Sequence, residues 1–245
     1  MTGPGEAAPT RRLKLLCAGA VKGLVAALQE RFLAASGATV DGRFGAVGAM
    51  REALLGGAPC DVMIVTEAML AELREQGAVA AQPSAPIGRV RTGVAVRAGE
   101  PLPRIASAAE LATTLRAAPA IFVPDTEQST AGRHVVTVLE RLGIAAETRD
   151  RLAVFPNGAT AMRALAESGA PGVLGCTQVT EILYTPGLAL AGALPDPFGL
   201  STVYAAGVGA QASEPVLAAA FIALLSGDTA AAERWAGGFE PLGPA

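Results

Sequence analysis

The sequence predicts an α/β protein built from two lobes. Strand and helix patterns alternate strictly between residues 13 and 76, which is typical of a parallel sheet covered by helices. Two long apolar strands, expected at residues 89–97 and 201–210, bracket a middle block with an αβ pattern of its own. We therefore expect two lobes, each a mostly parallel sheet flanked by helices, joined by two crossover strands.

The first lobe is expected to begin with a buried strand at residues 13–18. A helix follows at residues 21–35, because apolar residues recur there at the helical period, and Gly37 ends it. A second strand and a second helix are expected at residues 39–44 and 47–55.

A continuous apolar run at residues 61–65 is typical of an interior parallel strand, and a third helix is expected at residues 66–76. Residues 80–88, AAQPSAPIG, are too rich in proline, serine and small residues to continue a helix. We expect a break there, ahead of the strand at residues 89–97.

The middle block supplies the elements of the second lobe. Helices are expected at residues 111–117, 131–142, 159–168 and 178–183, and strands at residues 120–123, 152–155, 172–176 and 188–191. After the strand at 201–210, two helices near residues 215–225 and 229–235 close the chain. The first lobe is thus predicted to contain residues 1–88 and 198–245, and the second lobe residues 89–197.

Composition excludes several classes of protein. A net charge of −3 with 17% charged residues lacks the basic footprint of a nucleic-acid binder. No apolar run reaches the roughly 18 residues that a membrane span needs. One histidine and three scattered cysteines do not form a usual zinc set, and no dinucleotide or phosphate-loop motif is present. We expect neither a metal nor a cofactor.

The first residues, MTGPGEAAPTRR, lack the apolar segment of a secretory signal. We therefore expect a cytoplasmic protein if the chain is full length, and a periplasmic one if it is a mature domain.

Two helix N-termini, near residues 20–22 and 46–47, are expected at the ends of neighbouring strands. Their first turns have backbone N–H groups without intrahelical partners and carry the positive end of the helix dipole, so together they predict an anion site. Lys22 and Arg43 add positive charge nearby.

The segments AGAVKG, FGAVGAM and PCDVMIVTEAMLAEL, in this order, resemble the molybdate-binding type of periplasmic solute-binding protein, which has the two-lobed type II fold. PDTEQSTAGRHVVTVLERLGI, FPNGATAMRALAESG and GVLGCTQVTEILYTPG match its second-lobe ligand segments, so the resemblance extends from about residue 13 to about residue 235. It implies a ligand in the cleft between the lobes. The expected ligand contacts, with the nearby Arg43 included, are Ala20, Val21, Lys22, Arg43, Ala46, Val47, Ser129, Thr130, Ala131, Asn157, Thr160, Cys176, Thr177 and Gln178.

The match departs from molybdate binders in the first two segments. Those proteins typically present Ser or Thr hydroxyls there, whereas this chain has Ala20, Val21, Ala46 and Val47. A guanidinium and an ammonium group suit carboxylates, so we expect a small di- or tricarboxylate rather than molybdate. If the protein is exported, the resemblance implies an ABC-transporter permease as partner.

A second branch of the resemblance is catalytic. Aconitate isomerase is similar to solute-binding proteins of this type, which implies a cofactor-independent double-bond shift in an unsaturated carboxylate as the alternative function. Lys22 and Cys176 are the candidate catalytic residues, although a buried thiol that acts as a small apolar side chain is favoured at Cys176. Glu181 and Asp125 are further proton carriers that the sequence does not rank. For His134, the only histidine, a packed or solvated helical position is favoured over a catalytic one.

Overall fold

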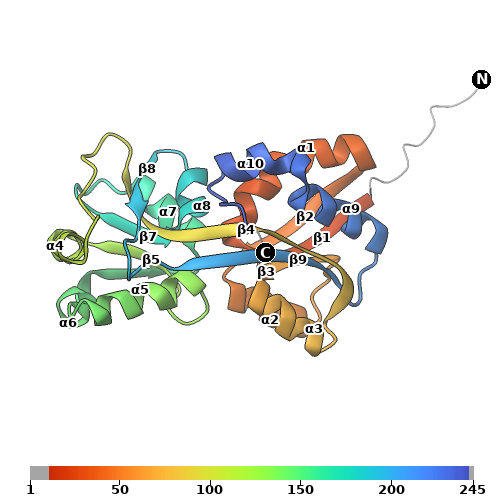
Figure 1. Ribbon diagram of the computed structural model, residues 1–245, viewed down its shortest axis with the longest axis horizontal. Helices are drawn as coiled ribbons and strands as arrows, with labels where there is room; N and C mark the ends of the chain where they lie inside the picture. Colours follow the sequence, from red (N-terminus) through yellow and green to blue (C-terminus); the bar gives the residue numbers. More distant parts are fainter. Residues whose placement is uncertain (1–10, 243–245) are drawn as a thin grey trace, which may run out of the picture.

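Two sheets that share one long strand form the framework of the molecule (Figure 1). The structure is a computed structural model and describes residues 11–242. Strand β4 (Val79–Arg97) pairs with β9 (Ser201–Gly209) along its first part and with strands of the other sheet from Thr92 onward. Because the two sheets meet in β4, this strand connects two lobes that have separate cores.

The first lobe contains β1 (Arg11–Ala18), which lies between β2 (Ala38–Gly45) and β3 (Val62–Thr66) and runs parallel to both. Strand β9 runs antiparallel to β3 and to β4, so the sheet is mixed. The helices of this lobe are α1 (Lys22–Ser36), α2 (Val47–Leu55), α3 (Glu67–Glu75), α9 (Pro215–Ser226) and α10 (Ala231–Ala236), with short 3₁₀ turns η1 (Gly19–Val21) and η3 (Asp228–Ala230).

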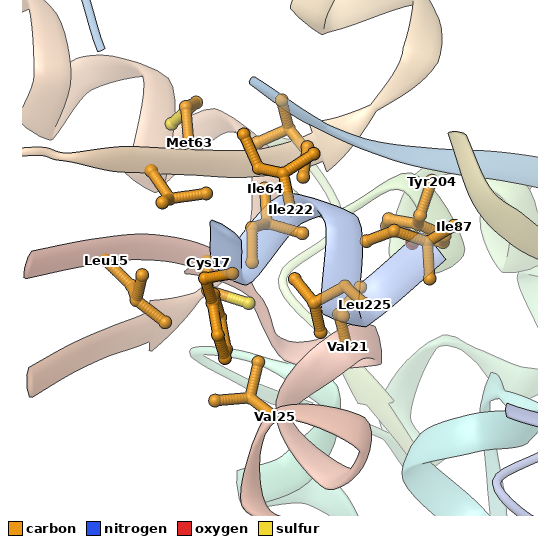
Figure 2. Packing of buried hydrophobic residues seen from close by; sticks show 14 of the residues in the cluster. Leu15, Cys17, Val21, Val25, Met63, Ile64, Ile87, Tyr204, Ile222 and Leu225 are labelled. Atoms are coloured by element: carbon orange, nitrogen blue, oxygen red, sulfur yellow. The ribbon is translucent and has the colours of Figure 1, made fainter. Parts of the chain in front are cut away.

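The core of the first lobe forms where the strands meet α1 and α9 (Figure 2). Cys17 of β1 and Val21 of η1 lie in the same buried cluster as Ile222 of α9. Elsewhere in this cluster, Phe32 packs edge-on against Phe221 with ring centroids 4.8 Å apart. This packing fixes the start of α1 at the carboxyl end of β1.

The second lobe repeats the arrangement around β5 (Ile121–Pro124), which is parallel to β6 (Leu152–Phe155) and β7 (Leu174–Gln178). Strand β4 runs antiparallel to β7 and to β8 (Leu188–Ala193), which makes this sheet mixed as well. Its helices are α4 (Ala108–Ala117), α5 (Thr130–Arg141), α6 (Ala145–Thr148), α7 (Gly158–Glu167) and α8 (Val179–Tyr184), with a 3₁₀ turn η2 (Arg149–Arg151).

The expected α/β architecture is confirmed, but the break predicted at residues 80–88 was wrong. Strand β4 continues through this stretch, with shifts of register between Val79 and Ser84 and between Pro86 and Gly88. Such irregularities accommodate prolines, which have no N–H to donate to a neighbouring strand. Proline content therefore indicated a loop where the chain forms an irregular strand.

We propose the predicted lobes, residues 1–88 with 198–245 and residues 89–197, with a small shift of the boundary at each crossing. Val90 packs in the cluster of the first lobe, whereas Phe198 packs with Val94 in a cluster of the second. Residues 1–10 and 243–245 of the predicted first lobe lie outside the described residues.

In the part of the chain that the structure describes, no single helix has both the length and the apolar composition to cross a membrane. One pair of helical segments, Pro215–Ser226 with Asp228–Ala236, has the length and apolar composition of a membrane span when the two are taken together, but the pair is bent by 60° at the break between them.

Candidate anion-binding cleft

A small cavity lies between the lobes at the ends of several strands. The residues that line it come from both lobes: Ala18, Gly19, Ala20, Gly45, Ala46, Val47, Ser129, Thr130, Asn157, Gly158, Gln178, Glu181 and Tyr204. Its volume is about 20 Å³, which is room for about one water molecule. A larger ligand can therefore enter only if the lobes move apart.

Four helices of nine or more residues begin at this cavity, and the six-residue helix α8 begins there too, at its N-cap Gln178. Helices α1, with its preceding turn η1, and α2 come from the first lobe, and helices α5 and α7 from the second. Ser129 and Asn157 cap α5 and α7 through their side chains, whereas Ala18 and Ala46 offer no side-chain cap to η1 and α2. Converging helix N-termini create a positive potential and present N–H donors, which suits an anion.

The structure brings about half of the predicted ligand contacts to the cavity. Those that line it are Ala20, Ala46, Val47, Ser129, Thr130, Asn157 and Gln178. Val21, Ala131 and Thr177 are buried beside the lining residues, and Thr160 lies in the first turn of α7.

The two predicted cations do not line the cavity. Lys22 borders a separate pocket of about 540 Å³ with Arg163 and Tyr184, and its Nζ lies 5.8 Å from the ring centroid of Phe44. Arg43 is exposed on β2, the edge strand of the first sheet. Because successive strand residues face opposite sides, a one-residue difference in phase decides the direction of Arg43. The carboxylate preference inferred from these two side chains therefore loses its basis.

The structure argues against Cys176 as a catalytic base. Its side chain packs in the core of the second lobe, and burial raises the pKa of the thiol to about 12. A thiol that acts as a base near neutral pH needs a lowered pKa. Cys176 is therefore a protonated, apolar core residue.

Two other candidates have structural roles. The Oδ1 atom of Asp125 accepts hydrogen bonds from the backbone amides of Glu127 and Gln128, at 2.8 and 2.7 Å, in the turn before α5. His134 Nε2 donates to the backbone carbonyl of Phe198 at 2.7 Å. Between residues 11 and 242, no group of three or more His, Cys, Asp or Glu side chains could hold a metal ion.

Glu181 is the ionisable group that the structure places in the cavity wall. Its residue is 6% exposed, and Thr177 Oγ1 donates to its Oε2 at 2.5 Å. Burial raises the pKa of this carboxyl to about 7. Hydrogen bonds from the Thr177 side chain and from the backbone N–H groups of Ala159 and Gln178 oppose the rise. The sequence alone indicates Glu181 only as an unranked proton carrier, since an acid in the first turn of a helix is a common capping residue.

Two glycines make room for this carboxyl. A Cβ atom at Gly158, in the second lobe with Glu181, would overlap with Oε2 and with the hydroxyl of Thr177. A Cβ atom at Gly19, in the first lobe, would lie 2.6 Å from Oε1. The carboxyl is therefore enclosed by its own lobe on one side and by the opposite lobe on the other.

Gln178 brings unpaired polar atoms to the same wall. The residue is 2% exposed, and both its Nε2 and its Oε1 lack hydrogen-bond partners in the structure. Gln178 lies close enough to the hydroxyl of Tyr204 to lower the pKa of that phenol, while burial acts more strongly in the opposite direction. A buried amide without partners costs free energy, so this position favours a bound group that can satisfy it.

The lobes also touch beside the cavity. Gly48 N of α2 donates to the carbonyl oxygen of Gln128 at 3.1 Å, and Gln128 Nε2 lies 3.1 Å from both carboxylate oxygens of Glu52. These hydrogen bonds hold the lobes in a closed arrangement.

Substitution of each glycine by alanine should distinguish a contact inside one lobe, which affects folding, from a contact between the lobes, which affects their closure. Gly158→Ala should lower the free energy of unfolding by about 1–3 kcal/mol, because the added methyl group overpacks the interior of one lobe. Gly19→Ala should change the free energy of unfolding by less than about 1 kcal/mol, because separation of the lobes removes the contact between the added methyl group and Oε1 of Glu181. Denaturant unfolding of both variants without ligand measures the difference, and equal losses would contradict this assignment.

The stability of the protein should depend on pH through Glu181. Its folded-state pKa is raised to about 7, so the folded state holds a proton that the unfolded state has lost, and stability falls with rising pH. Between about pH 5 and about pH 8, the loss should reach about 3 kcal/mol. Glu181→Gln should remove this component, whereas Glu140→Gln, exposed on α5, should retain it. Parallel curves for wild type and Glu181→Gln in urea unfolding would refute the prediction.

Comparison with known proteins supports the resemblance inferred from the sequence, including its isomerase-like branch. Aconitate isomerase of a Pseudomonas species is 24% identical over 244 residues, which cover 96% of this chain and 90% of that protein. The periplasmic molybdate-binding protein of Azotobacter vinelandii superposes with a TM-score of 0.77 at 19% identity, covering 94% of this chain and 99% of that one. The sulfate-binding protein SubI of Mycobacterium tuberculosis superposes with a TM-score of 0.72 at 18% identity, covering 96% of this chain and 88% of that one. A family model described as bacterial extracellular solute-binding protein matches residues 13–240. The chain therefore belongs to the family of bacterial extracellular solute-binding proteins.

Proposed function

We propose that the protein binds a small organic anion with one or more carboxylates in the cleft between its lobes, as a solute-binding protein. The observation that carries the proposal is the convergence of four helix N-termini on a cavity lined by Ser129, Thr130 and Asn157. Among the described residues that line it there is no Lys or Arg. Binding therefore relies on helix dipoles, backbone amides and neutral side chains.

The side chains of the second lobe favour an organic acid over molybdate or sulfate. The free Oε1 of Gln178 needs a donor, and a fully ionised oxyanion offers only acceptors. A hydroxyl group on an organic acid can donate to Oε1 while another oxygen accepts from Nε2. The similarity to aconitate isomerase supports a carboxylate ligand on separate grounds, since ionised aconitate has no hydroxyl group to donate to Oε1.

A hinge motion of the lobes should accompany binding, because the closed cavity has a volume of about 20 Å³. The family match favours delivery of the ligand to an ABC-transporter permease, if the protein is exported. Cell fractionation checks this part of the proposal, since a protein confined to the cytoplasm has no such partner.

A thermal-shift screen tests the proposal directly, since a ligand that binds only the folded state raises the melting temperature. The compounds are citrate, trans-aconitate, malate, molybdate and sulfate, measured near pH 6. One or more of the organic acids should raise the melting temperature, and the inorganic anions should do so less. A shift with molybdate or sulfate alone would overturn the carboxylate preference. No shift with any compound would overturn anion binding.

Gln178→Leu should lower affinity while leaving the fold at least as stable. Removing an unsatisfied buried amide should raise the free energy of unfolding by up to about 1–3 kcal/mol, since the desolvation penalty is lost. Affinity for the organic acid found in the screen should fall about tenfold or more, because a hydrogen-bonded contact is lost. Gln29→Leu, exposed on α1, is the matched control. Unchanged affinity in Gln178→Leu would remove this residue from the site.

A second candidate is the isomerisation of an unsaturated carboxylate, which the position of Glu181 in the cavity wall favours. In an allylic shift, the ionised carboxylate takes a proton from one carbon and the double bond moves. The carboxyl group exchanges its proton with solvent and then returns a proton to the other end of the allyl system. Helix N-termini would stabilise the negative charge that develops on the substrate.

Incubation of the protein with trans-aconitate in D₂O distinguishes the two candidates. A catalyst should introduce deuterium into the compound and produce its isomer, and Glu181→Gln should abolish both by NMR. If bound trans-aconitate stays unlabelled and unchanged, the protein is a binder.

A further inference from the structure

We propose that the cleft takes up one proton together with its anion, and that the carboxyl group of Glu181 carries this proton in the closed complex. The inference rests on the proposed binding function and adds the protonation state that the site requires. An anion beside an ionised Glu181 would meet a second negative charge in a space sheltered from water, where like charges repel strongly.

The geometry assigns different tasks to the two oxygens of this carboxyl. Oε2 accepts the hydrogen bond from Thr177 Oγ1 at 2.5 Å, inside the second lobe. Oε1 faces the first lobe, where it would lie 2.6 Å from a Cβ atom at Gly19, in the turn that leads into α1. A protonated carboxyl has a single O–H donor. With Oε2 engaged as an acceptor, the proton on Oε1 donates to an oxygen of the bound anion.

The side chains of the elements that pack against α8 supply no positive charge to the cavity. These elements are η1, α1, α7, β4, β7 and β8. Their titratable side chains nearest the cleft include Lys22, Arg163 and Glu167, which border the separate pocket of about 540 Å³. The others are Arg89, Arg91 and Arg97 of β4 and Cys176 of β7, while η1 and β8 have none. None of these side chains lines the cavity. Arg91 borders a pocket of the second lobe, and Arg97 pairs with Glu100.

Tyr204 of β9 also lines the cavity, but burial raises the pKa of its phenol, so it stays neutral, as does the thiol of Cys176. The pKa of Glu181 is set by burial, by Thr177 and by the amides of Ala159 and Gln178. With no cation to hold it ionised, the carboxyl gives up its charge when an anion arrives.

The direction of the pH effect follows. In the free protein burial raises the pKa of Glu181 to about 7, and a neighbouring anion raises it further. Well below that pH the carboxyl is protonated before binding, so no proton is taken up. Above it, uptake approaches one proton for each anion, and affinity falls up to about tenfold for each further pH unit.

Titration calorimetry with trans-aconitate tests the inference. Binding is measured from about pH 6 to about pH 9 in two buffers of different ionisation enthalpy, since the dependence of the heat on the buffer gives the number of protons taken up. Wild type should take up close to one proton near the upper limit and almost none at the lower limit. Glu181→Gln, which keeps a donor of similar shape, should bind with no uptake and with an affinity independent of pH. Glu140→Gln should behave as wild type does.

Thr177→Val provides a second test that does not remove the carboxyl. Losing the hydroxyl donor raises the pKa of Glu181, so proton uptake should begin at a higher pH, and Thr177→Ser should restore the wild-type profile. Binding by wild type without proton uptake at any pH would overturn this inference and leave the binding function intact. Absence of trans-aconitate binding at every pH would overturn the inference, and the screen of the other anions then decides the binding function separately.

Discussion

The buried carboxyl group of Glu181 constrains the cleft more than any other group, because it is an acid at a place whose helix N-termini attract anions. It is 6% exposed, bonded to Thr177, and enclosed by Gly19 and Gly158. When protonated it adds a hydrogen-bond donor to the site, and when ionised it competes with the ligand for the same positive potential. On the proposed mechanism, its protonation state therefore sets the affinity of the cleft for an anion.

The fold makes this group respond to the separation of the lobes. Glu181 and Gly158 belong to the second lobe, whereas Gly19 belongs to the first, and strand β4 joins the two (Figure 1). In the closed arrangement Gly158 and Gly19 enclose the carboxyl from the two sides. A binder is best served by the protonated form, whereas an isomerase needs the ionised form as a base. The two candidate functions thus require opposite states of one residue.

Much of the fold and part of the site could be predicted, because they depend on local patterns. The helix starts at Val47 and Thr130 follow from apolar periodicity and capping, and they do reach the cavity. The direction of Arg43 could not be predicted, since it depends on strand phase. Nor could the burial of Glu181, which results from glycines 162 and 23 positions away that only the tertiary fold brings near.

The most direct measurement of the central claim is difference infrared spectroscopy of the anion complex near pH 8, comparing wild type with Glu181→Gln. Wild type should gain the carbonyl stretch of a protonated carboxylic acid when the anion binds, and the variant should not. A complex in which Glu181 remains a carboxylate, with the anion bound beside it at full affinity, would contradict the claim.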